Sequence, residues 1–257
     1  MNEFSEFSSD FKMIGSFEGN PLDINQSLQR NDEWLKLRGG KYTGSKLKNL
    51  MGCGRSTSQK PWGAIEKLYD FGATVERYIY KVGMERLTGC LDMEINAKQL
   101  DYGKENESKL VEQLIKDGVI TDFEEVGFKT FYEYGGASAD GMCVYKGEKV
   151  GMELKCCTSW DGHYNRMYEP VHDKHDDFWQ FQGEMLALGV NKLLYVVAYP
   201  MTVEKYDVGI VEASPLHQKV LLERCKIGDK AIELWNDYPK PEALKIAIAQ
   251  HRESESL

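Results

Sequence analysis

Apolar residues three and four positions apart predict helices, and alternating apolar and polar residues predict strands. By these patterns the chain is helical towards both ends and rich in strands in the middle. Asp101 is a suitable N-cap for one helix, and Gly118 is the glycine expected just after its end. Helices are predicted within 29–89 (with a start at 43–45) and over 101–118, 178–189 and 215–249, and strands over 126–134, 141–145, 149–155, 193–199 and 206–211. This order favours an α/β fold, with helices flanking a small central mixed β-sheet.

The first 28 residues differ from the rest of the chain. They mix polar and acidic residues with isolated phenylalanines and show no sustained period, which predicts an N-terminal arm or flexible lead-in over 1–28. No internal repeat or low-complexity linker interrupts 29–257, so we expect one domain there.

The composition and net charge of the chain restrict the classes of function that it can have. The chain has 257 residues, 42% of them hydrophobic, with 32 basic and 41 acidic residues and a net charge of −9. This excess of acid argues against a protein that coats nucleic acid by general electrostatics. It does not exclude local binding of DNA, because a divalent metal ion held by carboxylates makes the local electrostatic potential positive. No apolar run suits a membrane span or a secretory signal, so a cytoplasmic protein with reduced cysteines is expected.

One predicted hairpin concentrates charged residues. Lys146-Gly147 suits a two-residue turn, since glycine readily takes the positive φ that such a turn requires. Counting outward from the turn pairs Tyr145 with Glu148, Asp140 with Glu153 and Ser138 with Lys155.

The strand period decides which way these side chains point. Val150, Met152 and Leu154 are expected to face the core, and Glu153 and Lys155 the opposite, open side. Opposed Cβ atoms lie about 4.5–5.5 Å apart, so Asp140 and Glu153 would repel unless a cation such as Mg²⁺ lay between them. Lys155 could then orient or deprotonate a water, or stabilise charge on a phosphate. The alternative is a set of solvated edge-strand charges.

Five segments in order strengthen the first interpretation. With them the chain resembles the lambda-type viral exonucleases, the YqaJ-like recombinases of the PD-(D/E)xK nuclease superfamily, and we therefore expect a restriction-endonuclease-like core. The segments are Arg38–Ser45 (RGGKYTGS), Tyr102–Glu107 (YGKENE), Gly136–Gly141 (GASADG), Glu153–Cys156 (ELKC) and Gln180–Met185 (QFQGEM).

The resemblance implies a catalytic core of Asp140, Glu153 and Lys155. It also implies that Glu107 reaches the metal from its helix, which we expect to pack on the open face of the hairpin, and that Gln180 supports the site from a later helix. Asp140, Glu153 and Glu107 would thus be the metal ligands. Glu107 has an alternative as a surface partner of a residue one helical turn away.

A phosphate pocket is implied as well. Arg38, Thr43 and Ser45 precede a predicted helix start, where backbone N–H groups favour an anion. The family holds the 5′-terminal phosphate of DNA there and with a serine near the catalytic aspartate, which makes Arg38, Ser45 and Ser138 the candidates. Arg38 has an alternative as a helix C-terminal cap. For the basic residue that the family carries after Glu-x-Lys, Arg166 is the substitute we consider.

The resemblance implies a Mg²⁺-dependent exodeoxyribonuclease, with Mn²⁺ as a second usable metal. Such an enzyme degrades linear duplex DNA from its ends in the 5′ to 3′ direction and leaves 3′ single-stranded tails for phage-type recombination. A homotrimer around the duplex and a single-strand annealing protein as partner are implied too. Two alternatives stay open, a structure- or site-specific endonuclease of the same superfamily and a non-catalytic subunit that binds DNA ends.

Overall fold

The computed structural model describes residues 32–91, 97–167, 172–175 and 177–255, so the predicted arm over 1–28 lies outside it. Its main feature is a five-stranded sheet in the order β2-β5-β6-β7-β8. In this sheet β6 and β7 are parallel and the other neighbours antiparallel, which confirms the predicted mixed sheet. The strands are β2 (Ile120–Glu125), β5 (Gly141–Tyr145), β6 (Glu148–Cys156), β7 (Lys192–Ala198) and β8 (Tyr206–Glu212).

A second, three-stranded sheet was not predicted. It has the order β1-β4-β3, with β1 (Tyr42–Thr43) parallel to β4 (Gly135–Ala137) and β3 (Lys129–Tyr132) antiparallel to β4. The strand expected over 126–134 is confirmed as the shorter β3. The helix start expected at 43–45 is confirmed too, because Thr43, the last residue of β1, is the N-cap of the 3-10 helix η1 (Gly44–Lys46). The strand β1 forms by pairing with a segment about 90 residues away in the chain. A local pattern of apolar and polar residues carries no information on such a distant partner.

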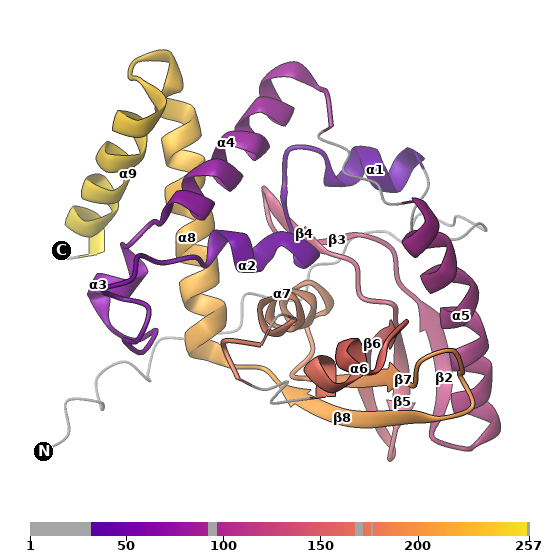
Figure 1. Ribbon diagram of the computed structural model, residues 1–257. Coiled ribbons are helices and arrows are strands. Elements are labelled where there is room, and N and C mark those ends of the chain that lie inside the picture. The colour runs from indigo at the N-terminus through magenta and orange to yellow at the C-terminus, as the bar shows by residue number, and fades with distance from the viewer. Residues whose placement is uncertain (1–31, 92–96, 168–171, 176, 256–257) are drawn as a thin grey trace, which may run out of the picture.

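Helices cover both faces of the five-stranded sheet (Figure 1). From α5 (Ala97–Lys116), Leu110 and Leu114 pack with Met152 and Leu154 of β6. From α7 (Phe178–Leu188), Phe181 and Met185 pack with Tyr195 and other residues of β7 on the opposite face. Both faces of β6 are therefore interior.

The other helices build the rest of the described chain. Figure 1 shows α4, α8 and α9 side by side, away from the five-stranded sheet, where they share a separate apolar core with α2. None of the described helices has the length and apolar character needed to cross a membrane. The elements are α1 (Asp32–Arg38), α2 (Leu47–Leu50), α3 (Ile65–Leu68), α4 (Ala73–Thr88), α6 (Trp160–Met167), α8 (Pro215–Glu233), the 3-10 helix η2 (Leu234–Asn236) and α9 (Lys240–Glu255).

Local signals set several boundaries as expected. Gly118 (φ 69°) follows α5 and Gly189 (φ 67°) caps α7, both in the left-handed conformation that glycine adopts without strain. Asp101, however, lies inside α5 rather than at its start. The helix α6 lies between the strand predicted over 149–155 and the helix predicted over 178–189, where the sequence pattern predicted no helix.

The predicted hairpin is confirmed. Lys146 (φ 50°) and Gly147 (φ 81°) form the turn, and both have the positive φ typical of a type I′ hairpin. The register pairs Tyr145 with Glu148 and Gly141 with Met152, as counted from the sequence.

Candidate active site

The candidate site lies where β5 ends and β6 continues. Pairing between the two strands stops at Gly141 and Met152, whereas β6 stays paired with β7 up to Cys156. The Leu154 N–H, left without a strand partner, donates to Oδ2 of Asp140 at 2.7 Å. Asp140 thus satisfies a backbone donor that would otherwise be unpaired, and its carboxylate is fixed at the open edge of β6.

Glu153 and Lys155 do not face an open side of the sheet, as the strand period led us to expect. Their face is covered by α7, so closely that a Cβ on Gly151 would lie 2.8 Å from Cδ1 of Leu188. Glu153 is only 3% exposed. The prediction failed because helices cover both faces of this sheet, so that neither face of β6 is open.

Three polar side chains meet on this covered face. Oε1 of Glu153 accepts hydrogen bonds from Nζ of Lys155 at 2.7 Å and from Nε2 of Gln180 at 2.6 Å. Lys155 also contacts the amide oxygen of Gln180 at 3.5 Å. Gln182 points elsewhere and donates to the Glu212 carbonyl at 3.2 Å. The structure therefore brings Gln180, rather than Gln182, to the predicted catalytic pair.

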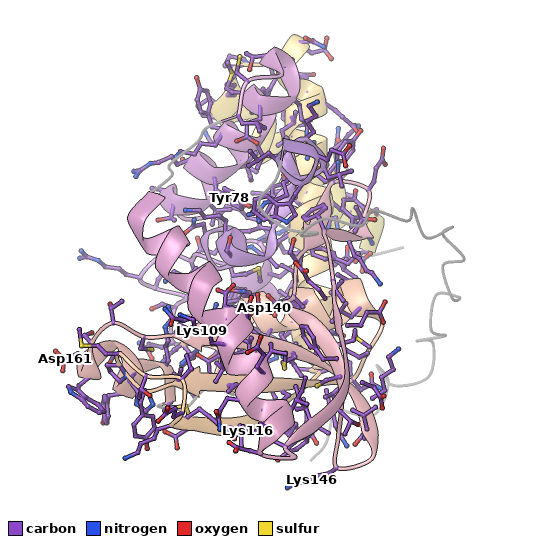
Figure 2. The ribbon with its side chains drawn as sticks, turned by 90° about the vertical axis from the view of Figure 1, so that its right-hand side faces the viewer. Tyr78, Lys109, Lys116, Asp140, Lys146 and Asp161 are labelled. Carbon is purple, nitrogen blue, oxygen red and sulfur yellow. The ribbon has the colours of Figure 1, made fainter. Side chains whose placement is uncertain are left out.

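Glu107 interacts electrostatically with Asp140. The pKa of Asp140 lies well above its usual range, first because burial disfavours the charged form and then because Glu153 and Glu107 repel it. Figure 2 shows Asp140 beside the helix α5 that carries Glu107. Yet α5 packs on the Leu154 face of β6, so the predicted packing of this helix on the Glu153 face is wrong.

The three predicted metal ligands are not drawn into a closed cage. Among the described residues, the group whose ligand atoms all lie within 4.8 Å of one another is Glu223, His251 and Glu255, on α8 and α9. Glu223 and His251 already share a hydrogen bond of 2.7 Å. The Asp140 site would therefore need water or substrate oxygens to complete the coordination of a metal ion.

The donor set nevertheless suits a hard dication. Oε2 of Glu153 is buried and has no hydrogen-bond partner within the described part of the chain. An unsatisfied buried carboxylate oxygen is costly unless a cation binds it. Mg²⁺ prefers oxygen ligands and commonly uses one or two carboxylates with water and phosphate oxygens, which matches Asp140 and Glu153.

Sequence reasoning missed a neighbouring charge network. Asp177 accepts from Arg166 at 2.6 Å and from the Tyr195 hydroxyl at 3.1 Å through the same oxygen. Burial opposes the charged form of Lys155, but the carboxylates of Glu153 and Asp177 outweigh it, so the pKa of Lys155 lies above its usual value. Arg166, the substitute considered for the family's basic residue, is thus close enough to influence Lys155.

Sequence reasoning also missed Glu184, which is 1% exposed on α7. Its Oε1 accepts from Nε2 of Gln180 at 2.6 Å. Burial, followed by repulsion from Glu153, raises the pKa of Glu184 well above its usual range. The signal was available, because residues four apart on a helix share a face and Glu184 follows Gln180 by four.

The candidate phosphate residues are joined through Trp34. Its Nε1 donates to Oγ of Ser138 at 2.8 Å, and the Arg38 guanidinium lies 3.8 Å above its ring. Arg38 contacts Oγ of Ser45 at 3.5 Å. A Cβ on Gly44 would lie 3.8 Å from Cγ of Gln180, which places this group next to the carboxylate site. Arg38 is also the last residue of α1, so the C-terminal alternative is compatible with its position.

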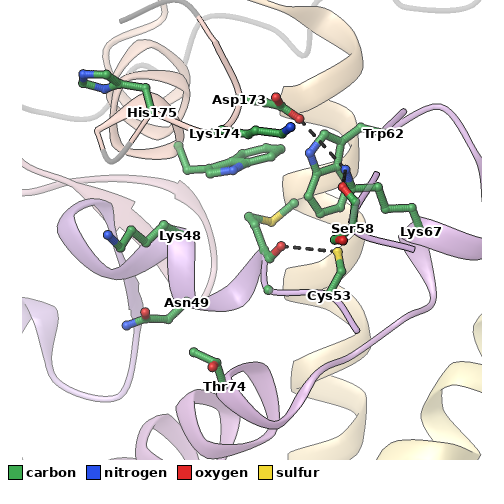
Figure 3. Close-up of a pocket in the computed structure, with 13 residues that line it drawn as sticks. Lys48, Asn49, Cys53, Ser58, Trp62, Lys67, Thr74, Asp173, Lys174 and His175 are labelled. Carbon is green, nitrogen blue, oxygen red and sulfur yellow. Dashed lines mark hydrogen bonds and ion pairs between the residues drawn. The ribbon is translucent and has the colours of Figure 1, made fainter. Parts of the chain in front are cut away.

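A cavity of about 340 Å³ lies beside α2 and α7 (Figure 3). Trp179, the neighbour of Gln180 on α7, forms part of its wall together with three lysines, Lys48, Lys67 and Lys174. Asp173 is the carboxylate in the lining, 4.0 Å from Nζ of Lys67. The cavity is therefore locally positive in an acidic protein.

Comparison with known proteins gives structural matches. No protein-family profile matches the chain, and no curated protein matches it by sequence. Among solved structures, the alkaline exonuclease LHK-Exo from Laribacter hongkongensis superposes with a TM-score of 0.62 and 22% identity, over 84% of this chain and 100% of the other. LHK-Exo in complex with dAMP gives a TM-score of 0.61 with the same identity and coverage.

A phage-related exonuclease from Haemophilus somnus 129PT superposes with a TM-score of 0.55 and 14% identity, over 85% of this chain and 98% of the other. At these identities the matches establish the arrangement of the elements. Together with the mixed sheet and its flanking helices, they confirm the fold that the five motifs implied. The chain therefore has the fold of the alkaline exonuclease LHK-Exo and of the phage-related exonuclease from Haemophilus somnus 129PT.

Proposed function

We propose that the protein is a metal-dependent exodeoxyribonuclease that degrades linear double-stranded DNA from its ends, in the 5′ to 3′ direction. The observation that carries the proposal is the meeting of Asp140, Glu153 and Lys155 at the open edge of β6, with one Glu153 oxygen buried and without a hydrogen-bond partner among the described residues. The shared fold of two exonucleases, one of them in complex with dAMP, supports DNA as the substrate.

In this proposal Asp140 and Glu153 hold Mg²⁺ or Mn²⁺, and Glu107 contributes directly or through a water. The metal would polarise the scissile phosphate and lower the pKa of a bound water. Because the raised pKa of Lys155 keeps its ammonium charged, we assign Lys155 the role of a donor that orients the attacking water and stabilises phosphate charge. Gln180 holds both Glu153 and Lys155 in place.

The residues joined through Trp34, which are Arg38, Ser45 and Ser138, would hold the 5′-terminal phosphate. Arg38 offers a planar fork of donors suited to phosphate, and Ser45 and Ser138 add hydroxyls, the first in contact with Arg38 and the second with Trp34. Binding the terminal phosphate next to the carboxylates would place the first phosphodiester at the metal and select DNA ends.

The experiment that tests the function compares a 5′-phosphorylated linear duplex with a closed circular duplex, each with Mg²⁺. Release of mononucleotides from the linear duplex alone is expected. Cutting of the circle would indicate an endonuclease of the same superfamily. Binding of DNA ends without cleavage of either substrate would indicate a non-catalytic subunit.

Metal binding should be visible in thermal unfolding. Asp140→Asn keeps an acceptor for the Leu154 N–H but removes a charge that repels Glu153 and Glu107. At about 100 times its Kd, Mg²⁺ should raise the Tm of the wild type by about 5 °C and leave that of Asp140→Asn unchanged. In EDTA the variant should unfold at a higher temperature than the wild type.

The matched control is Asp122→Asn on the exposed strand β2, which should keep the full response to Mg²⁺. A Tm shift retained by Asp140→Asn would remove Asp140 from the proposed ligands.

The lysine-lined cavity predicts a contact with DNA phosphates. The substitution Lys174→Glu, at an exposed lysine, should weaken duplex binding about fivefold in 0.1 M salt. It should also reduce the slope of log Kd against log salt concentration by about one. Lys245→Glu on α9, another exposed lysine, is the control. Fluorescence anisotropy at several salt concentrations measures both. Equal affinities for the two variants would place the DNA elsewhere.

The proposal also includes an oligomeric state and a partner protein. Both rest on the resemblance to the lambda-type exonucleases. A homotrimer would enclose the duplex, and a single-strand annealing protein would receive the 3′-ended product strand. Sedimentation equilibrium at micromolar concentration tests the first. A stable monomer that still degrades DNA processively would contradict it.

A further inference from the structure

The buried carboxylate of Glu184 has no place in the mechanism so far. It lies on α7 between Gly183 and Met185, 1% exposed, with Phe181 and Met185 of the same helix in the apolar core. Burying a carboxylate there costs free energy that an apolar residue would not. Its Oε2 has no hydrogen-bond partner in the described part of the chain.

A hydrogen bond joins Glu184 to the site. The Gln180 Nε2 donates to Oε1 of Glu184 at 2.6 Å and to Oε1 of Glu153 at 2.6 Å. An amide nitrogen carries two hydrogens, and these two acceptors use both. The amide oxygen is then turned to Nζ of Lys155, at 3.5 Å.

We propose that Glu184 is a positioning residue that fixes the orientation of the Gln180 amide and thereby leaves one oxygen of Glu153 available to the metal. With Glu184 as second acceptor, the amide nitrogen occupies Oε1 of Glu153 and the amide oxygen faces Lys155. Without it, one amide hydrogen loses its acceptor and the side chain is freer to rotate away from Glu153. The inference rests on the proposed metal-dependent function.

Two substitutions separate hydrogen bonding from charge. Glu184→Leu removes the acceptor at similar volume, whereas Glu184→Gln keeps an amide oxygen that can accept from Gln180. Metal affinity is measured without DNA, by calorimetric titration of Mn²⁺ into the full chain. Glu184→Leu should bind Mn²⁺ about 10- to 100-fold more weakly, the usual effect of losing a group that orients a metal ligand. Glu184→Gln should stay within about threefold of the wild type.

A double-mutant cycle tests whether Glu184 acts through Gln180. In a Gln180→Leu background, Glu184→Leu should cause no further loss of Mn²⁺ affinity. Gln182→Leu is the matched control, since Gln182 is a buried amide on the same helix that bonds to Glu212 and Ser214 instead. It should lower stability in urea unfolding without changing Mn²⁺ affinity.

The outcomes are distinguishable. Wild-type affinity in folded Glu184→Leu, or an equal loss in Glu184→Gln, would overturn the assignment. An additive loss in the double variant would show that Glu184 does not act through Gln180, which also overturns it. If Glu184→Leu does not fold, Glu184→Gln and the double variant still decide. Failure of the wild type itself to bind Mn²⁺ would instead contradict the proposed function.

Discussion

Lys155→Ala is expected to lower the rate of DNA cleavage by about 10²- to 10⁴-fold and to leave metal binding nearly intact. The ammonium donates to Glu153 at 2.7 Å, and the carboxylates around it hold it charged. Its removal takes away a donor to the attacking water or the phosphate, whereas Asp140 and Glu153 keep their oxygens. Single-turnover cleavage of a linear duplex and Mn²⁺ titration measure the two effects.

The control is Lys192→Ala on β7, which removes an ammonium paired with Glu148 at 2.6 Å on the exposed part of the same sheet. It should cleave at the wild-type rate, because exposed ion pairs contribute little. Turnover retained by a folded Lys155→Ala variant would remove the role assigned to Lys155.

Arg224→Met is expected to lower the free energy of unfolding by at least about 3 kcal/mol. Arg224 is 0% exposed on α8, and its guanidinium donates to the carbonyls of Lys67 at 3.2 Å, Gly52 at 2.9 Å and Asp70 at 3.1 Å. Burial lowers its pKa to about 10, so it remains charged at neutral pH. Methionine fills much of the space but leaves three carbonyls without their donor.

Urea unfolding measures this loss, and Arg252→Met is the control. Arg252 lies exposed on α9 with its guanidinium 4.5 Å from the Tyr69 ring, and its loss should cost less than about 1 kcal/mol. Because Arg224 holds the chain around Gly52 and Asp70 rather than the carboxylate site, cleavage at low temperature should survive. A loss of stability similar to that of Arg252→Met would show that water replaces the guanidinium.

The hairpin shows how far local information reaches. The Lys146-Gly147 turn and the alternation of apolar and polar residues beside it lie within about ten residues. They predicted the pairing of the two hairpin strands correctly from Tyr145 to Gly141. The edge strand β2 went unpredicted, because most of its side chains are exposed and give no apolar alternation. The strand β1 has two residues and exists through a parallel pairing with Gly135 and Gly136.

What the sequence by itself determined is the mixed α/β fold, the helix ends at Gly118 and Gly189, and the order of the motifs that carry the candidate chemistry. These depend on neighbours within a few turns of helix or residues of strand. Only the tertiary structure decided that α7 covers Glu153 and brings Gln180 to it, and that Asp140 accepts a hydrogen bond from the Leu154 N–H where β5 stops. These contacts join different elements, and their geometry follows from how the helices and strands pack together, which residue spacing does not encode.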